Sequence, residues 1–192
     1  MIITKQVIRD FVCPFYKEND LAHQIGHADE VCDLALKLNE TLEVKEEVKL
    51  VMLAAYFHDI FAKDREVHHE LSYTFVSETE EEIIAVLSDE ERKKVAMACL
   101  EHRSSFHDAF YSPLSEIISS ADRGIPNLKD NMERSKLFWM SRHGTDETAA
   151  ENHAREHMKE KYGANGYANY PLLYRRFFKT ELEVMQQEID NL

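Results

Sequence analysis

The feature that most constrains the fold is the helical spacing of apolar residues, which recurs almost from end to end. No stretch shows the sustained apolar–polar alternation that is typical of a β-strand. Residues that break helices are scarce, because the 192 residues include only 5 Gly and 4 Pro. No Pro/Gly/Ser-rich segment marks a domain boundary. The sequence therefore predicts an all-α fold, a helical bundle that forms a single domain over residues 1–192.

Apolar spacing and capping residues together give the positions of the individual helices. We expect helices at about 4–13, 20–39, 41–62, 67–77, 79–87, 89–102, 113–124, 129–142, 146–162 and 170–190. Pro14 is expected to end the first helix, Asn19 or Asp20 to cap the second, and Asp89 to cap the sixth. Pro113 suits the first turn of the seventh helix. The third helix is expected to bury Val44, Val48, Val51, Met52 and Ala55.

The chain is strongly acidic, with 36 Asp and Glu against 23 Lys and Arg, a formal net charge of −13 and a pI of about 5.2. Such a surface repels nucleic-acid backbones and anionic lipids over most of its area, so nucleic acid is not expected as a partner. A small anionic substrate remains compatible with this charge if cations are concentrated locally.

Cysteine usage and hydropathy indicate a reducing compartment. Cys13, Cys32 and Cys99 are far apart and form no Cys-x-x-Cys, so we expect small core residues rather than disulfides or a zinc knuckle. The longest apolar run, residues 50–57, is too short to cross a bilayer, and the N-terminal residues show no signal-peptide pattern. We therefore expect a cytoplasmic protein with no membrane partner.

The sharpest functional signal is the adjacent pair His58–Asp59, which closes the apolar stretch Ala-Ala-Tyr-Phe. An ionised carboxylate is costly to bury unless it is paired or bound to a metal. An imidazole beside a carboxylate suits a divalent cation of intermediate softness. The pair therefore indicates a metal ligand at the end of a buried helix.

Other His and Asp residues end or interrupt the apolar faces of further predicted helices. His27 follows His23 by four residues, His102 ends the apolar run that begins at Val95, and Asp122 ends the run at 117–121. A helical bundle can build a metal site from inward side chains, one from each helix. We therefore expect a metal site between the central helices.

This ordered set resembles the HD superfamily of metal-dependent phosphohydrolases, whose pattern is a His, then a His–Asp pair, then a later Asp. The matching stretches are HQIGHADEV with His27, AAYFHDIF with His58 and Asp59, and ISSADRG with Asp122. His23 and Val31 also match small bacterial members of the superfamily. The resemblance covers a motif core at about 20–125, with a C-terminal helical extension at about 126–192. It implies a single HD-type domain.

The resemblance also implies a role for each site residue. His27, His58, Asp59 and Asp122 would ligate one divalent metal ion, whether Mg, Mn, Fe, Co, Ni or Zn. The metal would lower the pKa of bound water and polarise a phosphoryl oxygen. His69 and His102 would ligate a second metal, with Asp59 bridging. His102 would otherwise hydrogen-bond the leaving group, which makes Asp59 and His102 the implied catalytic residues. The chain would then hold one or two metal ions.

Cationic and polar side chains near these ligands indicate a phosphate-bearing substrate. Four cationic residues lie within a few positions of a proposed ligand, namely Lys63, Arg65, Arg103 and Arg123. An Arg side chain can bind phosphate through two N–H bonds at once. His23 joins them as a candidate substrate-binding residue. We expect a nucleotide or another small phosphorylated metabolite. The sequence His-Asp-Ile-Phe-Ala-Lys lacks the Gly-Lys of the HD-GYP subgroup, so the resemblance does not extend to that subgroup. A homo-oligomer is compatible with the sequence.

Two other functions stay open at this stage. Some HD-fold proteins of this size are di-iron oxygenases, and such a site would use His27, His58, Asp59, His69, His102 and Asp122. The chain would otherwise be a non-catalytic protein that binds a nucleotide or another ligand.

The stretch H-x-x-E-H at 153–157 matches the inverted zinc-protease signature, but its helix is charged on nearly all sides, so a solvated face is the better interpretation. Aromatic residues of the tail are expected to pack in the core, with a nucleobase wall as the alternative.

Overall fold

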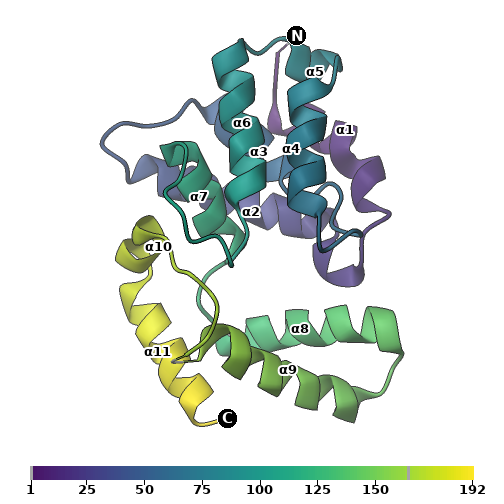
Figure 1. Cartoon of the computed structure of the whole chain (residues 1–192), viewed down its shortest axis with the longest axis vertical. Coiled ribbons are helices and arrows are strands. Elements are labelled where there is room, and N and C mark those ends of the chain that lie inside the picture. The colour runs from purple at the N-terminus through teal and green to yellow at the C-terminus, as the bar shows by residue number, and fades with distance from the viewer. Residues whose placement is uncertain (1, 164) are drawn as a thin grey trace.

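The computed structural model describes residues 2–163 and 165–192, and these residues form eleven α-helices and one short 3₁₀ helix, with no strand among them. The predicted all-α class is confirmed. Figure 1 shows α1 to α7 grouped as a bundle, with α8 to α11 below one end of it. None of the described helices is both long and apolar enough to cross a membrane.

The N-terminal bundle is built around α3 (Val48–Phe57). The other members are α1 (Lys5–Tyr16), η1 (Leu21–His23), α2 (Ile25–Glu40), α4 (His68–Glu78), α5 (Glu82–Ala85), α6 (Asp89–Glu101) and α7 (Pro113–Asp122). Helix α3 contacts α1, α2, α6 and α7, so every residue from Leu50 to Phe57 is buried. A helix that is apolar on all sides needs such an enclosed position. Burial of a side chain such as Phe57 contributes about 1.5–3 kcal/mol.

The C-terminal helices form a second group that covers one end of the bundle (Figure 1). They are α8 (Leu128–His143), α9 (Glu147–Tyr162), α10 (Leu172–Phe177) and α11 (Lys179–Asp190). Helices α8 and α9 pack together as a hairpin whose turn includes Gly144, at a φ of +98° that favours glycine. Helix α8 contacts η1, and α10 contacts α7. These contacts place the hairpin against the end of the bundle where η1 lies.

Two expected helix boundaries at the N-terminal end are wrong. Helix α1 continues through Pro14 to Tyr16, because Tyr16 is fully buried and its hydroxyl donates to the Tyr56 carbonyl at 3.1 Å. The expected second helix is broken at Gln24, which is extended, so Asp20 caps only the short η1. Tertiary packing decides the first boundary, and a local change of backbone decides the second.

The expected helix at 41–62 is shorter at both ends. Val51, Met52 and Ala55 are buried as predicted, but Val44 and Val48 are 83% and 51% exposed because they precede or begin α3. The helix ends at Phe57, and residues 58–67 form turns. His58 is the C-cap of α3, and its backbone N–H still donates to the Ala54 carbonyl, so the His–Asp pair lies directly at the end of the buried helix.

Later boundaries are mostly confirmed. Pro113 begins α7, and α4, α8 and α9 lie within two residues of their expected ranges. Ser88 rather than Asp89 caps α6, through a capping box with Glu91. The last expected helix is divided at Phe178 into α10 and α11. Of the cysteines, all unpaired thiols, Cys32 and Cys99 are buried as predicted, whereas Cys13 is partly exposed.

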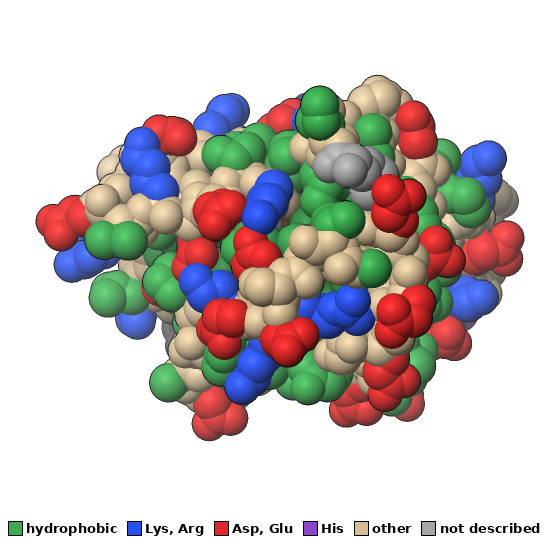
Figure 2. Space-filling model, turned by 90° about the horizontal axis from the view of Figure 1, so that it is seen from above, with side chains coloured by type: hydrophobic (Ala, Val, Ile, Leu, Met, Phe, Trp, Pro, Cys, Tyr) green, Lys and Arg blue, Asp and Glu red, His purple; other side chains and the backbone are tan. Residues whose placement is uncertain are grey.

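On the face seen from above the view of Figure 1 (Figure 2), charged side chains are spread rather than gathered. Figure 2 views the molecule from above Figure 1, and acidic and basic side chains are interspersed over that face. No histidine is visible in this view. The acidic excess of the chain is therefore not concentrated in one patch on this face.

Candidate metal centre

Four of the predicted ligands meet at one end of the bundle. His27 lies in the first turn of α2, His58 caps the end of α3, Asp59 follows it, and Asp122 ends α7. The His27 Nε2 atom is 3.0 Å from Asp122 Oδ1 and 3.8 Å from Asp59 Oδ2. The His58 Nε2 atom is 3.6 Å and 3.5 Å from the same two oxygens. One ligand atom from each residue lies within 4.8 Å of every other, so this group can hold a metal ion.

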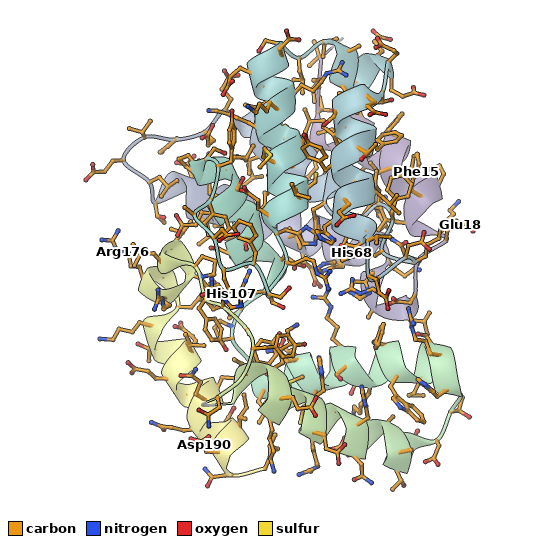
Figure 3. The ribbon with its side chains drawn as sticks, in the orientation of Figure 1. Phe15, Glu18, His68, His107, Arg176 and Asp190 are labelled. Carbon is orange, nitrogen blue, oxygen red and sulfur yellow. The ribbon has the colours of Figure 1, made fainter. Side chains whose placement is uncertain are left out.

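A second group shares Asp59 with the first. His68 begins α4, and His102 caps the end of α6. Their Nε2 atoms lie 3.2 Å and 3.4 Å from Asp59 Oδ1, and 3.2 Å from each other. Asp59 thus directs Oδ2 toward His27 and His58, and Oδ1 toward His68 and His102. Figure 3 shows His68 at the lower end of α4, on the side that faces α8. Asp59 would therefore be the shared ligand if each group held a cation.

All six of these residues lie at or next to the ends of helices, and three of the histidines are oriented in the same way. The Nδ1 atom of His58, His68 and His102 lies 2.7–2.8 Å from the carbonyl oxygen three residues earlier, on Ala55, Arg65 and Cys99. An imidazole that donates from Nδ1 presents a lone pair at Nε2. The helix ends therefore direct three Nε2 lone pairs toward Asp59.

Two buried polar atoms of this cluster lack hydrogen-bond partners among the described residues. They are His58 Nε2 and Asp59 Oδ1. The Nε2 atoms of His68 and His102 face each other, although both rings already donate from Nδ1. Buried polar atoms without partners are costly, and a cation would satisfy all of them. The nitrogen and carboxylate donors present fit a divalent transition-metal ion.

The pKa shifts favour the ligand forms of most of these groups. Burial lowers the pKa of His68 to about 3, and burial together with the Arg134 charge lowers the pKa of His27 to about 3. Burial would raise the pKa of Asp59, but the surrounding imidazoles hold it well below its ordinary value. His58 differs, because the two carboxylates outweigh burial and raise its pKa. Metal binding requires ionised carboxylates and neutral imidazoles, so binding there competes with a proton on His58.

The expected second-metal ligand His69 is wrong by one residue. His69 follows His68 on α4, which turns its side chain by about 100° around the helix, and its Nε2 lies 3.9 Å from Glu70 instead. His68, Ser72 and Val76 are the buried residues of α4. Their spacing of four was the sequence signal that would have selected His68.

A cavity of about 360 Å³ opens beside the ligands. Asp59, His68, His102 and Asp122 lie on its bundle side, and residues of α8 and α9 form the opposite wall. Five cationic side chains that form no ion pair with a carboxylate among the described residues also line it, namely Arg65, Arg103, Arg123, Arg134 and Lys161. The cavity therefore combines cationic side chains with the carboxylates of Asp59 and Asp122.

The other predicted substrate-binding residues have different positions. His23 lines the cavity, with its Nδ1 2.7 Å from Asp20 and its ring against His27. Lys63 is exposed and is not among the lining residues. Arg123 is only 7% exposed, and its donors are taken by Ser119 and by the carbonyls of residues 102, 103, 119 and 169. Arg123 also lines the cavity, and these hydrogen bonds join the end of α7 to the C-terminal segment.

The C-terminal residues of the cavity wall were missed by sequence reasoning. They include Arg134 and Phe138 of α8, and His157 and Lys161 of α9. Tyr162 of α9, one of the tail aromatics for which a nucleobase wall was the alternative, also lines the cavity. The H-x-x-E-H stretch contributes only His157 to the wall, and neither of its histidines belongs to a metal-ligand group among the described residues. Tyr162, Tyr174 and Phe178 are buried in the core, as predicted for the aromatic tail, whereas Tyr167 reaches the cavity.

Comparisons with known protein families, with curated proteins and with solved structures found no significant match. The functional argument for this chain therefore rests on its own residues.

Proposed function

We propose that this protein is a metal-dependent phosphohydrolase of the HD type that acts on a small phosphorylated metabolite or nucleotide. One observation supports the proposal above the others. Six His and Asp side chains form two ligand groups around a shared carboxylate, Asp59, and the cluster opens onto a cavity lined by Arg and Lys. The first feature suits one or two divalent cations, and the second suits an anion beside them.

The residues of the chain divide into two roles. The six His and Asp residues would hold the cations, and Asp59 would be common to both groups, since its Oδ2 lies near His58 and its Oδ1 near His68. Bound divalent cations supply a Lewis acid for a phosphoryl oxygen and lower the pKa of water. Arg65 and Arg103 line the same cavity and carry donors that can orient phosphate oxygens.

Cavity size and surface charge restrict the substrate. A volume of about 360 Å³ suits a small molecule, at the lower end of the range for ligand sites. The net charge of −13 opposes the approach of a long polyanion, whereas the local cations attract a small one. These two properties favour a nucleotide or a sugar phosphate over a nucleic acid.

The same six ligands are compatible with a di-iron oxygenase, which is the second candidate function. The observation that favours hydrolysis over oxygen chemistry is the set of cavity cations without carboxylate partners. A neutral organic substrate would leave these cations without an anionic partner. A charged cavity of this kind is costly to maintain without an anionic ligand.

The test is phosphate release from a panel of nucleotides and sugar phosphates by metal-stripped protein to which Mg, Mn, Fe(II), Co, Ni or Zn is added. Asp59→Asn removes the shared carboxylate, and Asp64→Asn is the matched control because Asp64 is exposed and belongs to neither ligand group. We expect metal-dependent release that only Asp59→Asn abolishes. Oxygen uptake by Fe(II)-loaded protein, with no phosphate release under any metal, would instead establish the second candidate.

A further inference from the structure

Arg134 belongs to the α8–α9 hairpin, outside the segment that resembles a known motif. It lies on one face of α8 with Asn131, Ser135 and Phe138, and all four line the cavity. Helix α9 presents His157 and Lys161 to the same cavity. These spacings of three and four residues are those of a single helix face. The hairpin therefore directs one face of each helix toward the ligands.

The charge of Arg134 has no carboxylate partner within the described part of the chain. Its side chain is half-buried, and its Nη2 lies 2.9 Å from His27 Nε2, to which it donates when the His27 proton is on Nδ1. The same Nε2 lies 3.0 Å from Asp122 Oδ1. By contrast, Lys136 on the same helix forms ion pairs with Glu133 at 2.8 Å and with Glu151 at 3.4 Å. In a chain with 36 acidic side chains, a half-buried guanidinium beside a cavity, without any of them as partner, suits an anionic ligand.

The bond between Arg134 and His27 competes with metal binding. A ring nitrogen has one lone pair, so His27 Nε2 cannot both accept from Arg134 and ligate a cation. When His27 ligates a cation, the Arg134 guanidinium loses this partner while it still lies beside the ligand group. Its freed N–H donors then require an acceptor in the cavity.

We propose that Arg134 exchanges His27 for an oxygen of the substrate phosphate and is thus a specificity-determining residue contributed by the hairpin. This inference rests on the proposed function, because it takes the ligand to be a phosphate held beside the cations. A guanidinium binds phosphate through two parallel N–H bonds, which an ammonium cannot reproduce. Arg134 therefore distinguishes phosphate from a ligand with a single charged oxygen.

The experiment measures binding of inorganic phosphate to Mn²⁺-loaded protein by isothermal titration calorimetry. We compare wild type with Arg134→Gln, Arg134→Lys and the control Lys129→Gln, which removes an exposed charge from the same helix outside this cavity. Arg134→Gln should weaken phosphate binding about 10- to 100-fold. Arg134→Lys should restore part of the affinity, and Lys129→Gln should match wild type.

Metal affinity separates this role from a structural one. Arg134→Gln removes a donor that competes for His27, so its Mn²⁺ affinity should equal or exceed that of wild type. Unchanged phosphate affinity in Arg134→Gln would overturn the inference, and so would a loss of Mn²⁺ affinity together with a lowered Tm. Failure of wild type to bind phosphate would overturn it as well.

Turnover separates this inference from the proposed function. If wild type hydrolyses a substrate and Arg134→Gln leaves KM unchanged, the inference fails while the function stands. If no substrate is hydrolysed but phosphate binding still requires both Mn²⁺ and Arg134, the function fails while the inference stands. We expect Arg134→Gln to raise KM by more than it lowers kcat, because Arg134 contacts the phosphate in the bound substrate as well as in the transition state.

Discussion

His68 and His69 offer a matched pair of substitutions for testing the second ligand group. His68→Gln removes one of the three ligands of the group Asp59, His68 and His102, whereas His69→Gln leaves all three in place. His68 is 1% exposed, and its Nδ1 is paired with the Arg65 carbonyl at 2.8 Å. Loss of that hydrogen bond should cost the metal-free protein about 1 kcal/mol, which corresponds to a Tm lower by about 2–4 °C.

The larger difference should follow metal addition. A metal ion at a free concentration of about 1,000 times its Kd stabilises the folded state by about 4 kcal/mol per site. For a domain of this size, that corresponds to a rise in Tm of about 8–16 °C per site. Wild type and His69→Gln should gain this increment twice, and His68→Gln once.

The assay is scanning calorimetry of metal-stripped protein titrated with Mn²⁺, with equilibrium dialysis to count bound ions. Two ions should bind to wild type and to His69→Gln, and one to His68→Gln. The assignment is refuted if His69→Gln loses an ion while His68→Gln retains two. A single ion in all three proteins would refute the bridging role of Asp59.

Three further substitutions test the packing that positions the site. The Lys49 hydrogen bond lowers the pKa of Glu91 from 4.5 to about 2, so its stabilising effect is present above about pH 4.5 and lost as the pH falls toward 2. In urea unfolding, Glu91→Gln should therefore cost about 0.5–1 kcal/mol at pH 7 and nothing near pH 2. Arg123→Met should cost about 2–4 kcal/mol because it leaves buried carbonyls without a donor, whereas exposed Arg176→Met should stay within about 0.5 kcal/mol. Tyr16→Phe should cost about 1 kcal/mol through its bond to a carbonyl of α3, and an unchanged urea midpoint would contradict that.

The first ligand group could be predicted from the sequence because its members end runs of apolar residues. A polar residue that ends or directly follows a buried helix is held near the interior of the protein. His58, Asp59 and Asp122 all have this position. The structure brings these three together with His27, as the prediction required. Local patterning indicated these residues only one by one, and the resemblance to the HD pattern joined them with His27 into one ligand set.

Sequence reasoning missed residues whose positions in the fold depend on where a helix begins or on which element packs against that helix. His68 and His69 are adjacent, and only the position of α4 against the bundle decides which one is buried. Arg134 lies on a helix with charged residues on several sides, so its sequence gives no preferred face. Its role follows from the contact between α8 and η1, which joins segments more than 100 residues apart.

The cavity is assembled from two stretches of chain that are separate in the sequence. The cation ligands all come from residues 27–122, and the opposite wall comes largely from the hairpin of α8 and α9 at residues 128–162. Mutations in the hairpin can therefore reshape the wall while every ligand stays in place. For the function proposed above, replacing that segment alone would exchange one substrate preference for another without altering the candidate ligands, so selectivity and chemistry could diverge independently.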